Sequence, residues 1–314
     1  MNISILNEFF FNEGHLCRLK RLGRLDIYDD TVSEAQALLR IKGAQIAIVE
    51  GFKTPLNNTV LENADELKLL ALSSTAYHFV DLEFAAKKGI NVANVPGFST
   101  EAVAEHTIAL MFAVIRQIPL GDRKVKQSLF EISASEDDNR FLGFDIKGKT
   151  LGVLGLGSIG TRVAELGIAL GMKVVAYNRT PRKIQDVELL SLDEVLRTSD
   201  VISVNLALTP ETEGIISDRA LALMKPRAVL INTATGPHVN TQALYKALKA
   251  KTIFGAGLDM LAEWDENNPL LELDNIVLSP HSAWWTNEAC ANLRDTIVGN
   301  VESFVRGEPS NLVN

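Results

Sequence analysis

The chain has 314 residues, a formal net charge of −8 and 46% hydrophobic residues. This composition excludes a mainly disordered chain, and the length suggests two domains. The acidic balance, with no basic block beyond residues 179–183, argues against nucleic acid as the main ligand. Two cysteines are too few for a disulfide framework or a cysteine-only metal site, and no apolar run reaches the roughly 20 residues that span a bilayer. The N-terminal basic residues follow the apolar stretch, the wrong order for a signal peptide. We therefore expect a cytoplasmic protein with no metal, no nucleic acid and no membrane partner.

Short apolar runs alternate with helix-period stretches in the first hundred residues. Strands are predicted at 3–6, 46–49, 69–72 and 91–93, and helices around 32–41 and 80–88. This alternation is typical of an α/β fold with a largely parallel sheet. After Gly97, Ser99 and Thr100 are suited to cap a long helix that runs through Ile115. Residues 119–149 are polar and weakly periodic, so we expect them to leave the body of the fold.

A second alternation begins at Thr150. Strands are predicted at 151–154, 173–177, 201–204, 228–232, 253–258 and 276–278, with a helix from about 158 to 170. Six strands joined by crossovers are enough for a complete doubly wound domain.

A glycine-rich turn joins the first strand of this second set to its helix. It reads Gly155-Leu156-Gly157-Ser158-Ile159-Gly160. The first glycine permits a tight turn, the second lets a diphosphate approach the backbone, and the third lets helix and strand pack closely. The context favours dinucleotide binding over the alternative, a glycine turn kept only for packing.

The end of the next strand bears on which nicotinamide cofactor binds. An acid there would bind a ribose 2′-hydroxyl, but Asn178 stands there instead. It is followed by Arg179, Thr180, Arg182 and Lys183, and an arginine can form a charge-assisted fork with a 2′-phosphate. We therefore predict a preference for NADP over NAD. The alternative is that these cations are merely solvated.

Several longer stretches resemble the D-isomer-specific 2-hydroxyacid dehydrogenases, which include glyoxylate/hydroxypyruvate reductases and phosphoglycerate dehydrogenases. The similarity covers nearly the whole chain. The stretches are NVPGFSTEAVAEHTIAL (94–110), GKTLGVLGLGSIG (148–160), LTPETEGII (208–216), LMKPRAVLINTATG (223–236), GAGLD (255–259) and LSPHSAWWTNEA (278–289).

The resemblance implies a Rossmann cofactor domain, a doubly wound parallel sheet formed by residues 99–286. This domain would be inserted in a smaller, flavodoxin-like α/β substrate domain built from 1–98 and 287–314. It further implies a substrate cleft at the hinge. A homodimer would form through the long helix and the excursion near 100–147.

Hydride transfer to a 2-oxo acid needs a proton carrier, a cation for the carboxylate, and a group that tunes the proton carrier. The resemblance assigns the proton to His281, which directly follows the last predicted strand. The family pattern then places an arginine within Ala-Arg-Gly, where this chain reads Ala234-Thr235-Gly236. Thr235 can form one neutral hydrogen bond but no salt bridge. Arg227 precedes the predicted strand 228–232, so the length of that strand would hold it away from the cleft. It therefore does not replace the missing arginine.

The tuning carboxylate is ambiguous. The family position, counted from Asp259, falls on Trp264, in a segment two residues shorter than the usual pattern. Glu263 is the favoured candidate, Asp265 is the second, and the alternative is that both are solvated loop charges. A carboxylate at either place would raise the pKa of His281.

The remaining site residues are implied by the resemblance. Asp259 would meet the nicotinamide amide, and Thr209, Pro210 and Thr233 would line the cofactor. Backbone N–H groups of Thr75 and Ala76 would face the substrate carboxylate, although the family has a glycine at position 76. His78 is a candidate substitute cation, with a surface or packing role as the alternative. Trp284 would form an aromatic wall.

Two functions follow from these residues. The first is an NAD(P)-dependent oxidoreductase acting on a small 2-oxo or 2-hydroxy acid, atypical because Thr235 replaces the guanidinium. The second is an NAD(P)-binding dimer with little or no turnover that acts as a sensor or scaffold, since a fold alone does not determine function. The presence of His281, Asp259 and the glycine turn favours the enzyme.

Overall fold

The computed structural model describes residues 1–7, 11–127 and 141–314. The chain divides into two compact units, one formed by Met1–Ser99 with Thr286–Asn314 and the other by Thr100–Trp285. Each unit is built on a parallel sheet, so the predicted α/β fold class is confirmed. Much of the predicted excursion, residues 128–140, lies outside the described residues.

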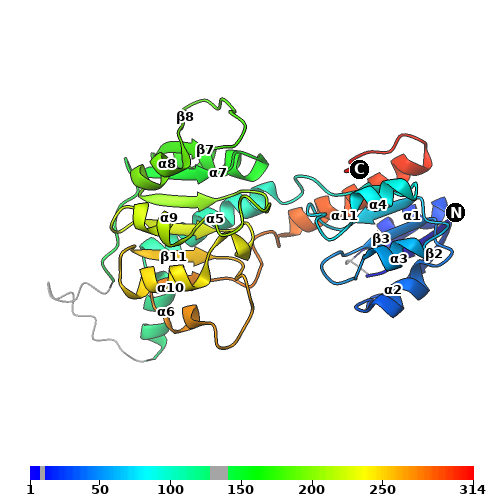
Figure 1. The fold of residues 1–314 in the computed structure, drawn as a ribbon, viewed down its shortest axis with the longest axis horizontal. Coiled ribbons are helices and arrows are strands. Elements are labelled where there is room, and N and C mark those ends of the chain that lie inside the picture. Colours follow the sequence, from blue (N-terminus) through cyan, green and yellow to red (C-terminus); the bar gives the residue numbers. More distant parts are fainter. Residues whose placement is uncertain (8–10, 128–140) are drawn as a thin grey trace. The chain divides into compact units, whose positions relative to one another are not determined.

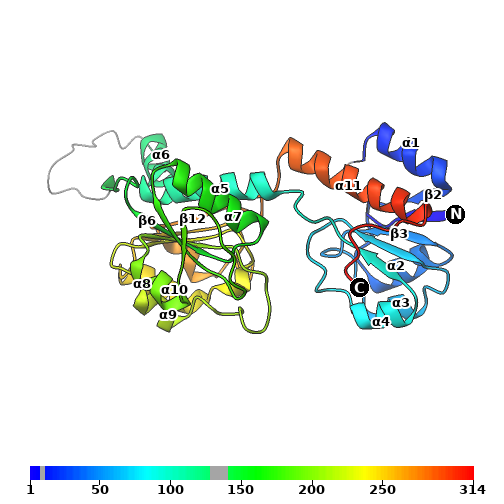
Figure 2. The same cartoon turned by 90° about the horizontal axis from the view of Figure 1, so that it is seen from above.

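The first unit has a five-stranded parallel sheet in the order β2-β1-β3-β4-β5, the flavodoxin-like order. Its strands are β1 (Asn2–Ile5), β2 (Arg24–Ile27), β3 (Ile46–Val49), β4 (Leu69–Leu72) and β5 (Asn91–Ala93). Every residue of β3 and β4 is buried, as the continuous apolar runs of a central parallel strand require. The helices are α1 (Glu13–Leu22), α2 (Glu34–Ile41), α3 (Asn58–Glu62), α4 (Leu82–Lys87) and α11 (Asn287–Val305). Figure 2 shows α1 and α11 on one face of this sheet and α2, α3 and α4 on the other.

The C-terminal segment completes this first unit. Helix α11 packs on β4, and the residues after it run beside β5, where Leu312 forms an antiparallel bridge with Ala93. The Val313 N–H donates to the Val92 carbonyl at 2.9 Å. Strands from the beginning of the chain and a helix from its end therefore share one core.

The second unit has a seven-stranded parallel sheet in the order β12-β11-β10-β9-β6-β7-β8 (Figure 1). The strands are β6 (Thr150–Leu154), β7 (Lys173–Tyr177), β8 (Val187–Leu189), β9 (Val201–Val204), β10 (Val229–Asn232), β11 (Gly255–Leu258) and β12 (Ile276–Leu278). The chain starts at β6, adds β7 and β8 on one side, and then adds β9 to β12 on the other. The order therefore reverses between β6 and β9, and ligands of such sheets bind at the carboxyl ends of the strands at this point.

Helices cover both faces of the second sheet. They are α5 (Thr100–Ile115), α6 (Ile118–Lys126), α7 (Ser158–Ala169), α8 (Leu192–Thr198), α9 (Asp218–Leu223) and α10 (Thr241–Lys249), with short 3₁₀ turns η2 (Gly236–His238) and η3 (Pro269–Glu272). Helices α5 and α7 lie on one face and α8, α9 and α10 on the other (Figure 2). In the described residues no single helix meets the length and hydropathy needed to cross a membrane; α5 and α6 meet them only jointly, across a 60° bend.

Candidate active site

The glycine turn follows β6 at the reversal point of the sheet. Gly155 has φ +97°, and a Cβ on it would lie 2.7 Å from the Asn205 carbonyl oxygen. A Cβ on Gly160 would lie 1.9 Å from the Gly155 carbonyl oxygen. These two positions therefore require glycine for conformation and for packing.

Gly157 differs from these two glycines because a Cβ on it would meet nothing within 4 Å. It caps α7, which begins at Ser158, without a side-chain hydrogen bond to the first turn. The first turn of α7, which includes Ile159, thus begins beside an uncrowded stretch of backbone. That arrangement fits the diphosphate of a dinucleotide, which such helix ends attract.

Asn205, which follows β9 beside the glycine turn, was not predicted as a site residue. Its Nδ2 donates to Ser203 Oγ at 2.8 Å. Its Oδ1 is buried and has no partner among the described residues. A buried acceptor without a donor is uncommon, so Asn205 supplies a place for a ligand N–H or O–H. Asn205 directly follows the predicted strand 201–204. A polar residue in that place was a signal that the sequence analysis did not use.

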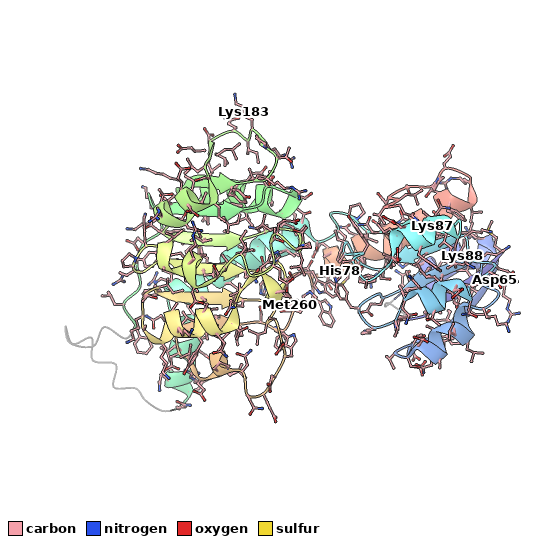
Figure 3. The ribbon with its side chains drawn as sticks, in the orientation of Figure 1. Asp65, His78, Lys87, Lys88, Lys183 and Met260 are labelled. Carbon is pink, nitrogen blue, oxygen red and sulfur yellow. The ribbon has the colours of Figure 1, made fainter. Side chains whose placement is uncertain are left out.

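The loop after β7 is fastened to the glycine turn. Asn178 Oδ1 accepts from the Leu156 N–H at 2.9 Å, and its Nδ2 donates to the Thr180 carbonyl at 2.6 Å. Arg182 Nη1 donates to the Leu156 carbonyl at 2.9 Å. Figure 3 shows Lys183 pointing outward from the same loop. Arg182 is therefore the cation of this loop that the structure places against the glycine turn.

Arg179 faces a carboxylate on the loop after β9. The pKa of Glu211 is lowered by a hydrogen bond from the Thr209 side chain, by its own backbone N–H and by the charge of Arg179. The Thr209 N–H donates to Thr212 Oγ1 at 2.8 Å, which shapes this loop, and Pro210 is exposed on it. The Arg179 charge is thus near enough to Glu211 to favour its ionised form.

Asp259 organises the loop that carries His281. Its carboxylate is almost fully buried and accepts from Ser279 Oγ at 2.5 Å and from the N–H groups of Ser282 and Ala283 at 3.0 Å each. Its backbone carbonyl accepts from the His281 N–H at 2.7 Å. The structure therefore uses both carboxylate oxygens to fold residues 279–283.

His281 itself is exposed, with a left-handed φ of +54°. A residue other than glycine in this region is strained by about 1–2 kcal/mol, and the surrounding loop must supply that energy. Such strain is common where a side chain is held for function. The hydrogen bonds to Asp259 are what hold the imidazole-bearing residue in this conformation.

His106 on α5 joins this cluster and was not predicted. Its Nε2 lies 2.9 Å from Ser279 Oγ and 3.5 Å from Asp259 Oδ1. It comes from the stretch 94–110 that carried part of the family resemblance. An imidazole within that motif, directly before the buried Thr107, was the available signal.

Thr233 turns its hydroxyl away from the open edge of the sheet. Its Oγ1 lies 2.7 Å from Thr107 Oγ1 on α5, and Thr107 in turn donates to the Val103 carbonyl at 2.8 Å. Because the Thr107 proton is used on Val103, the Thr233 hydroxyl donates to Thr107. The Thr233 hydroxyl proton is therefore used inside the protein, and its lone pairs remain as acceptors.

Thr235 lies three residues beyond the end of β10 and is the N-cap of the turn η2. Its Oγ1 lies 3.0 Å from Nδ1 of His238, a fully buried histidine that sequence reasoning missed. A Cβ on the intervening Gly236 would lie 2.2 Å from the Leu261 backbone, so this turn is closely covered. Arg227 stands before β10, with its guanidinium over the Phe254 ring at 5.4 Å. It therefore lies at the opposite end of the strand from Thr235.

The two candidate carboxylates differ in their surroundings. Both Glu263 and Asp265 are exposed. Asp265 Oδ1 accepts from the N–H and Nδ2 of Asn267 at 2.9 and 3.1 Å, so it shapes its own turn.

Trp284 stacks on the exposed Trp285 at 5.6 Å between ring centres. In the described residues no group of three His, Cys, Asp or Glu side chains is arranged to hold a metal ion.

The predicted substrate loop lies in the first unit, after β4. Thr75 Oγ1 donates to the Val95 carbonyl at 2.8 Å, and Ser74 Oγ donates to the Ala76 carbonyl at 2.7 Å. Within the described part of the chain, the N–H groups of Thr75 and Ala76 have no acceptor. His78 is exposed and packs edge-on against Phe79. The loop thus offers two N–H groups of the kind that bind a carboxylate.

Comparison with known proteins agrees with this geometry. Residues 108–283 match the NAD binding domain of the D-isomer specific 2-hydroxyacid dehydrogenases. Glyoxylate reductase of Thermococcus litoralis is 37% identical over 310 residues, which cover 96% of this chain and 94% of that protein.

Two solved structures align over the full length of the chain. One, an acyclic imino acid reductase in complex with NADPH and D-Arg, has a TM-score of 0.93 and 35% identity, with 100% of both chains covered. The other, D-lactate dehydrogenase from Aquifex aeolicus with NAD and lactic acid, has a TM-score of 0.87 and 32% identity, with 100% of this chain and 99% of that one covered. The chain belongs to the D-isomer specific 2-hydroxyacid dehydrogenase family of NAD(P)-dependent oxidoreductases.

Proposed function

We propose that this protein uses NADPH to reduce a small 2-oxo acid, such as glyoxylate or hydroxypyruvate, to the D-2-hydroxy acid. The observation that carries the proposal is the Asp259-anchored loop, which holds His281 in a strained conformation at the same edge of the sheet as the glycine turn. The bound cofactor supplies the hydride. The glyoxylate reductase relative supports this substrate class.

Within this proposal each residue has a separate task. His281 donates a proton to the C2 oxygen during reduction, and Glu263, with Asp265 as the alternative, stabilises its imidazolium. The free N–H groups of Thr75 and Ala76 are suited to the carboxylate. Trp284 contributes apolar surface for the substrate. Protein residues 155–160 hold the diphosphate, and Asn205 Oδ1 accepts a hydrogen bond from the cofactor.

The loop after β7 supports a preference for NADPH over NADH. The residue directly after β7 is Asn178 and not a carboxylate, so it does not repel a 2′-phosphate. Asn178 is also hydrogen-bonded to the glycine turn. Arg182 lies against that turn, and the NADPH-bound structural neighbour supports the same choice.

The proposal is tested by measuring NADPH oxidation with glyoxylate, hydroxypyruvate, pyruvate and phenylpyruvate. Removal of a general acid typically lowers the rate by about 10²- to 10⁴-fold, so His281→Ala is expected to lose kcat by that factor while still binding NADPH. Tight NADPH binding without turnover of any substrate by the wild-type protein would instead favour the sensor or scaffold.

A second candidate reaction is reduction of the C=N bond of an imino acid. Thr235 stands where the family pattern has an arginine, so the usual guanidinium for a 2-oxo acid is missing at this position. One of the two structural neighbours reported above, which align over the whole chain, is an acyclic imino acid reductase. Supplying glyoxylate together with an ammonium salt, and analysing the products for glycine as well as glycolate, tests this candidate directly.

A further inference from the structure

We propose that His106 is a positioning residue for the proton donor His281, and that it acts through Ser279 and Asp259. The inference rests on the proposed function and deepens it, because it identifies what keeps the proton donor in place. All four residues belong to the second unit, where they lie on α5 and on the loops that follow β11 and β12.

The directions of the hydrogen bonds in this cluster follow from the Asp259 carboxylate. A carboxylate only accepts, so the Ser279 hydroxyl, 2.5 Å from Asp259 Oδ1, donates its single proton there. His106 Nε2 lies 2.9 Å from the same Ser279 oxygen, which then has only lone pairs to offer. Nε2 must therefore carry a proton and donate it to Ser279. This nitrogen is protonated in one neutral tautomer and in the imidazolium, so the contact holds in both charge states.

His106 and the carboxylate thus hold the Ser279 side chain from two sides. His106 Nε2 also lies 3.5 Å from Asp259 Oδ1, and Asp259 is only 1% exposed. Buried charges need hydrogen-bond donors around them. Loss of the imidazole therefore removes a donor from the Ser279 oxygen and a balancing group from the buried carboxylate at the same time.

Ser279 and Asp259 fix the backbone of His281 directly. The His281 N–H donates to the Asp259 carbonyl at 2.7 Å, and the His281 nitrogen lies 3.1 Å from the Ser279 carbonyl oxygen. The N–H groups of the two residues after His281 donate to the Asp259 carboxylate. His281 has a φ of +54°, a conformation that persists only where the surrounding contacts impose it. The two residues that His106 contacts are therefore those that hold His281 in this conformation.

Helix α5 provides a fixed point for these contacts. It packs on β10, β11 and β12, and Thr107, Leu110 and Met111 on it are buried. The residues that follow β11 and β12 lie outside the regular elements, so their geometry depends on side-chain contacts of this kind. A group displaced by about 1 Å from its reacting position can lower a rate by about 10²-fold. His106 therefore links the rigid helix to the position of the proton donor.

The experiment compares His106→Leu with His106→Gln in the full chain. Leucine removes the donor, whereas the glutamine amide carries an N–H at about the distance of Nε2 from the backbone. The kcat for glyoxylate with NADPH is expected to fall at least about tenfold in His106→Leu and to stay within about threefold of wild type in His106→Gln. NADPH binding, followed by cofactor fluorescence, shows that each variant is folded. Glu105→Gln, at the exposed neighbouring position on α5, is the matched control.

A double mutant tests whether His106 acts through His281. In the His281→Ala background the proton donor is absent, so adding His106→Leu is expected to change the remaining rate less than about threefold. A purely structural role would lower the rate by the same factor in both backgrounds.

The solvent isotope effect on kcat, measured in D₂O, gives an independent readout. It is expected to rise in His106→Leu, because a displaced acid slows the transfer of the proton. A smaller amount of folded enzyme would lower kcat and leave the isotope effect unchanged, since each remaining molecule reacts as the wild type does.

A kcat in His106→Leu within about threefold of wild type would overturn the inference, as would an equal loss with and without His281. If His106→Leu does not fold, Ser279→Ala carries the test, because it breaks the same link and is expected to lose kcat only when His281 is present. An unchanged kcat in His281→Ala alone is a different result, since it removes the proposed function itself.

Discussion

At the scale of single residues, Thr235 stands where the family resemblance places an arginine. A bidentate arginine–carboxylate pair combines charge with two parallel hydrogen bonds, and one neutral hydroxyl supplies neither. Thr235→Arg is therefore expected to raise kcat/KM for glyoxylate at least about tenfold, from a charge-assisted bond of roughly 2 kcal/mol or more.

The control for this variant is Thr235→Lys, which adds charge without the planar fork and is expected to give a smaller gain. Steady-state kinetics with NADPH provides the measurement. A guanidinium at this position that leaves the glyoxylate rate at the wild-type level would mean that carboxylate binding does not limit this enzyme.

His238 makes a separate prediction about stability and pH. Burial lowers its pKa in the folded protein, so the unfolded chain binds the proton first as the pH falls. The free energy of unfolding is then highest above the unfolded pKa, about 6.5, and declines below it by up to about 1.4 kcal/mol per pH unit. His238→Leu removes this slope, which urea unfolding between about pH 8 and pH 5 measures. The matched control is His78→Gln, at an exposed position; equal slopes in wild type and His238→Leu would contradict the prediction.

At the scale of elements, the loop after β12 depends on one carboxylate. In Asp259→Asn, the amide nitrogen faces either the Ala283 N–H or the Ser282 N–H, each of which now donates to the carboxylate. A buried donor set against a donor costs about 1–3 kcal/mol. We expect a lower melting temperature and a fall in kcat, because His281 loses its fixed position, with a smaller change in NADPH affinity. Glu272→Gln, at an exposed carboxylate, is the control. An unchanged kcat in Asp259→Asn would mean that catalysis does not depend on the hydrogen bonds that fold this loop.

The loop after β7 leads to a prediction about the relative affinity for NADPH and NADH. Arg182 contacts the glycine turn, and Lys183 points outward from the same loop. Arg182→Ala is expected to weaken NADPH binding about tenfold or more relative to NADH, as loss of a charge-assisted bond implies. Lys183→Ala, as the matched control, is expected to change the ratio of the two dissociation constants less than threefold, roughly the effect of an exposed charge. An unchanged ratio in Arg182→Ala would mean that other residues determine the cofactor preference.

The elements also show which parts of the fold the sequence could predict. The strands at 46–49, 69–72, 91–93, 173–177, 201–204 and 276–278 were predicted with their observed bounds. Most of them lie inside their sheets, but 91–93 and 276–278 are edge strands, and what all six share is a mainly apolar run. Strands β2 and β8 were missed. Both lie at an edge of their sheet, and most of their residues are only partly buried or exposed, so no apolar run marks them.

The site divides in the same way. The glycine turn and the segment around His281 follow from local motifs. The contacts of His106 with Ser279 and of Asn205 with the turn join residues far apart in sequence, and no local pattern reports them. His238 escaped notice because a histidine three residues after a threonine is unremarkable until the 3₁₀ turn η2 brings the two side chains together.

At the scale of the whole molecule, the prediction concerns assembly. The family resemblance implies a homodimer formed near residues 100–147. Sedimentation of the purified protein is therefore expected to give twice the chain mass of 34.3 kDa, with or without NADPH. A monomer at micromolar concentration would contradict this prediction. Introducing a charge at Ile118, which is exposed on α6, is expected to weaken the dimer; Lys126→Glu, on the same helix, serves as the control for added charge.

The joining of both chain ends in one core has a consequence for biosynthesis. As the ribosome releases the polypeptide from its N-terminus, β1 to β5 emerge first, yet α11 and the strand-like tail that pack on β4 and beside β5 are made last. Residues 100–285 contain every strand of their own sheet, so they can finish folding while the older, N-terminal part is still waiting. Residues 1–99 are thus translated before the segment that completes their core, and during that interval their uncovered apolar strands are the surface a chaperone would recognise.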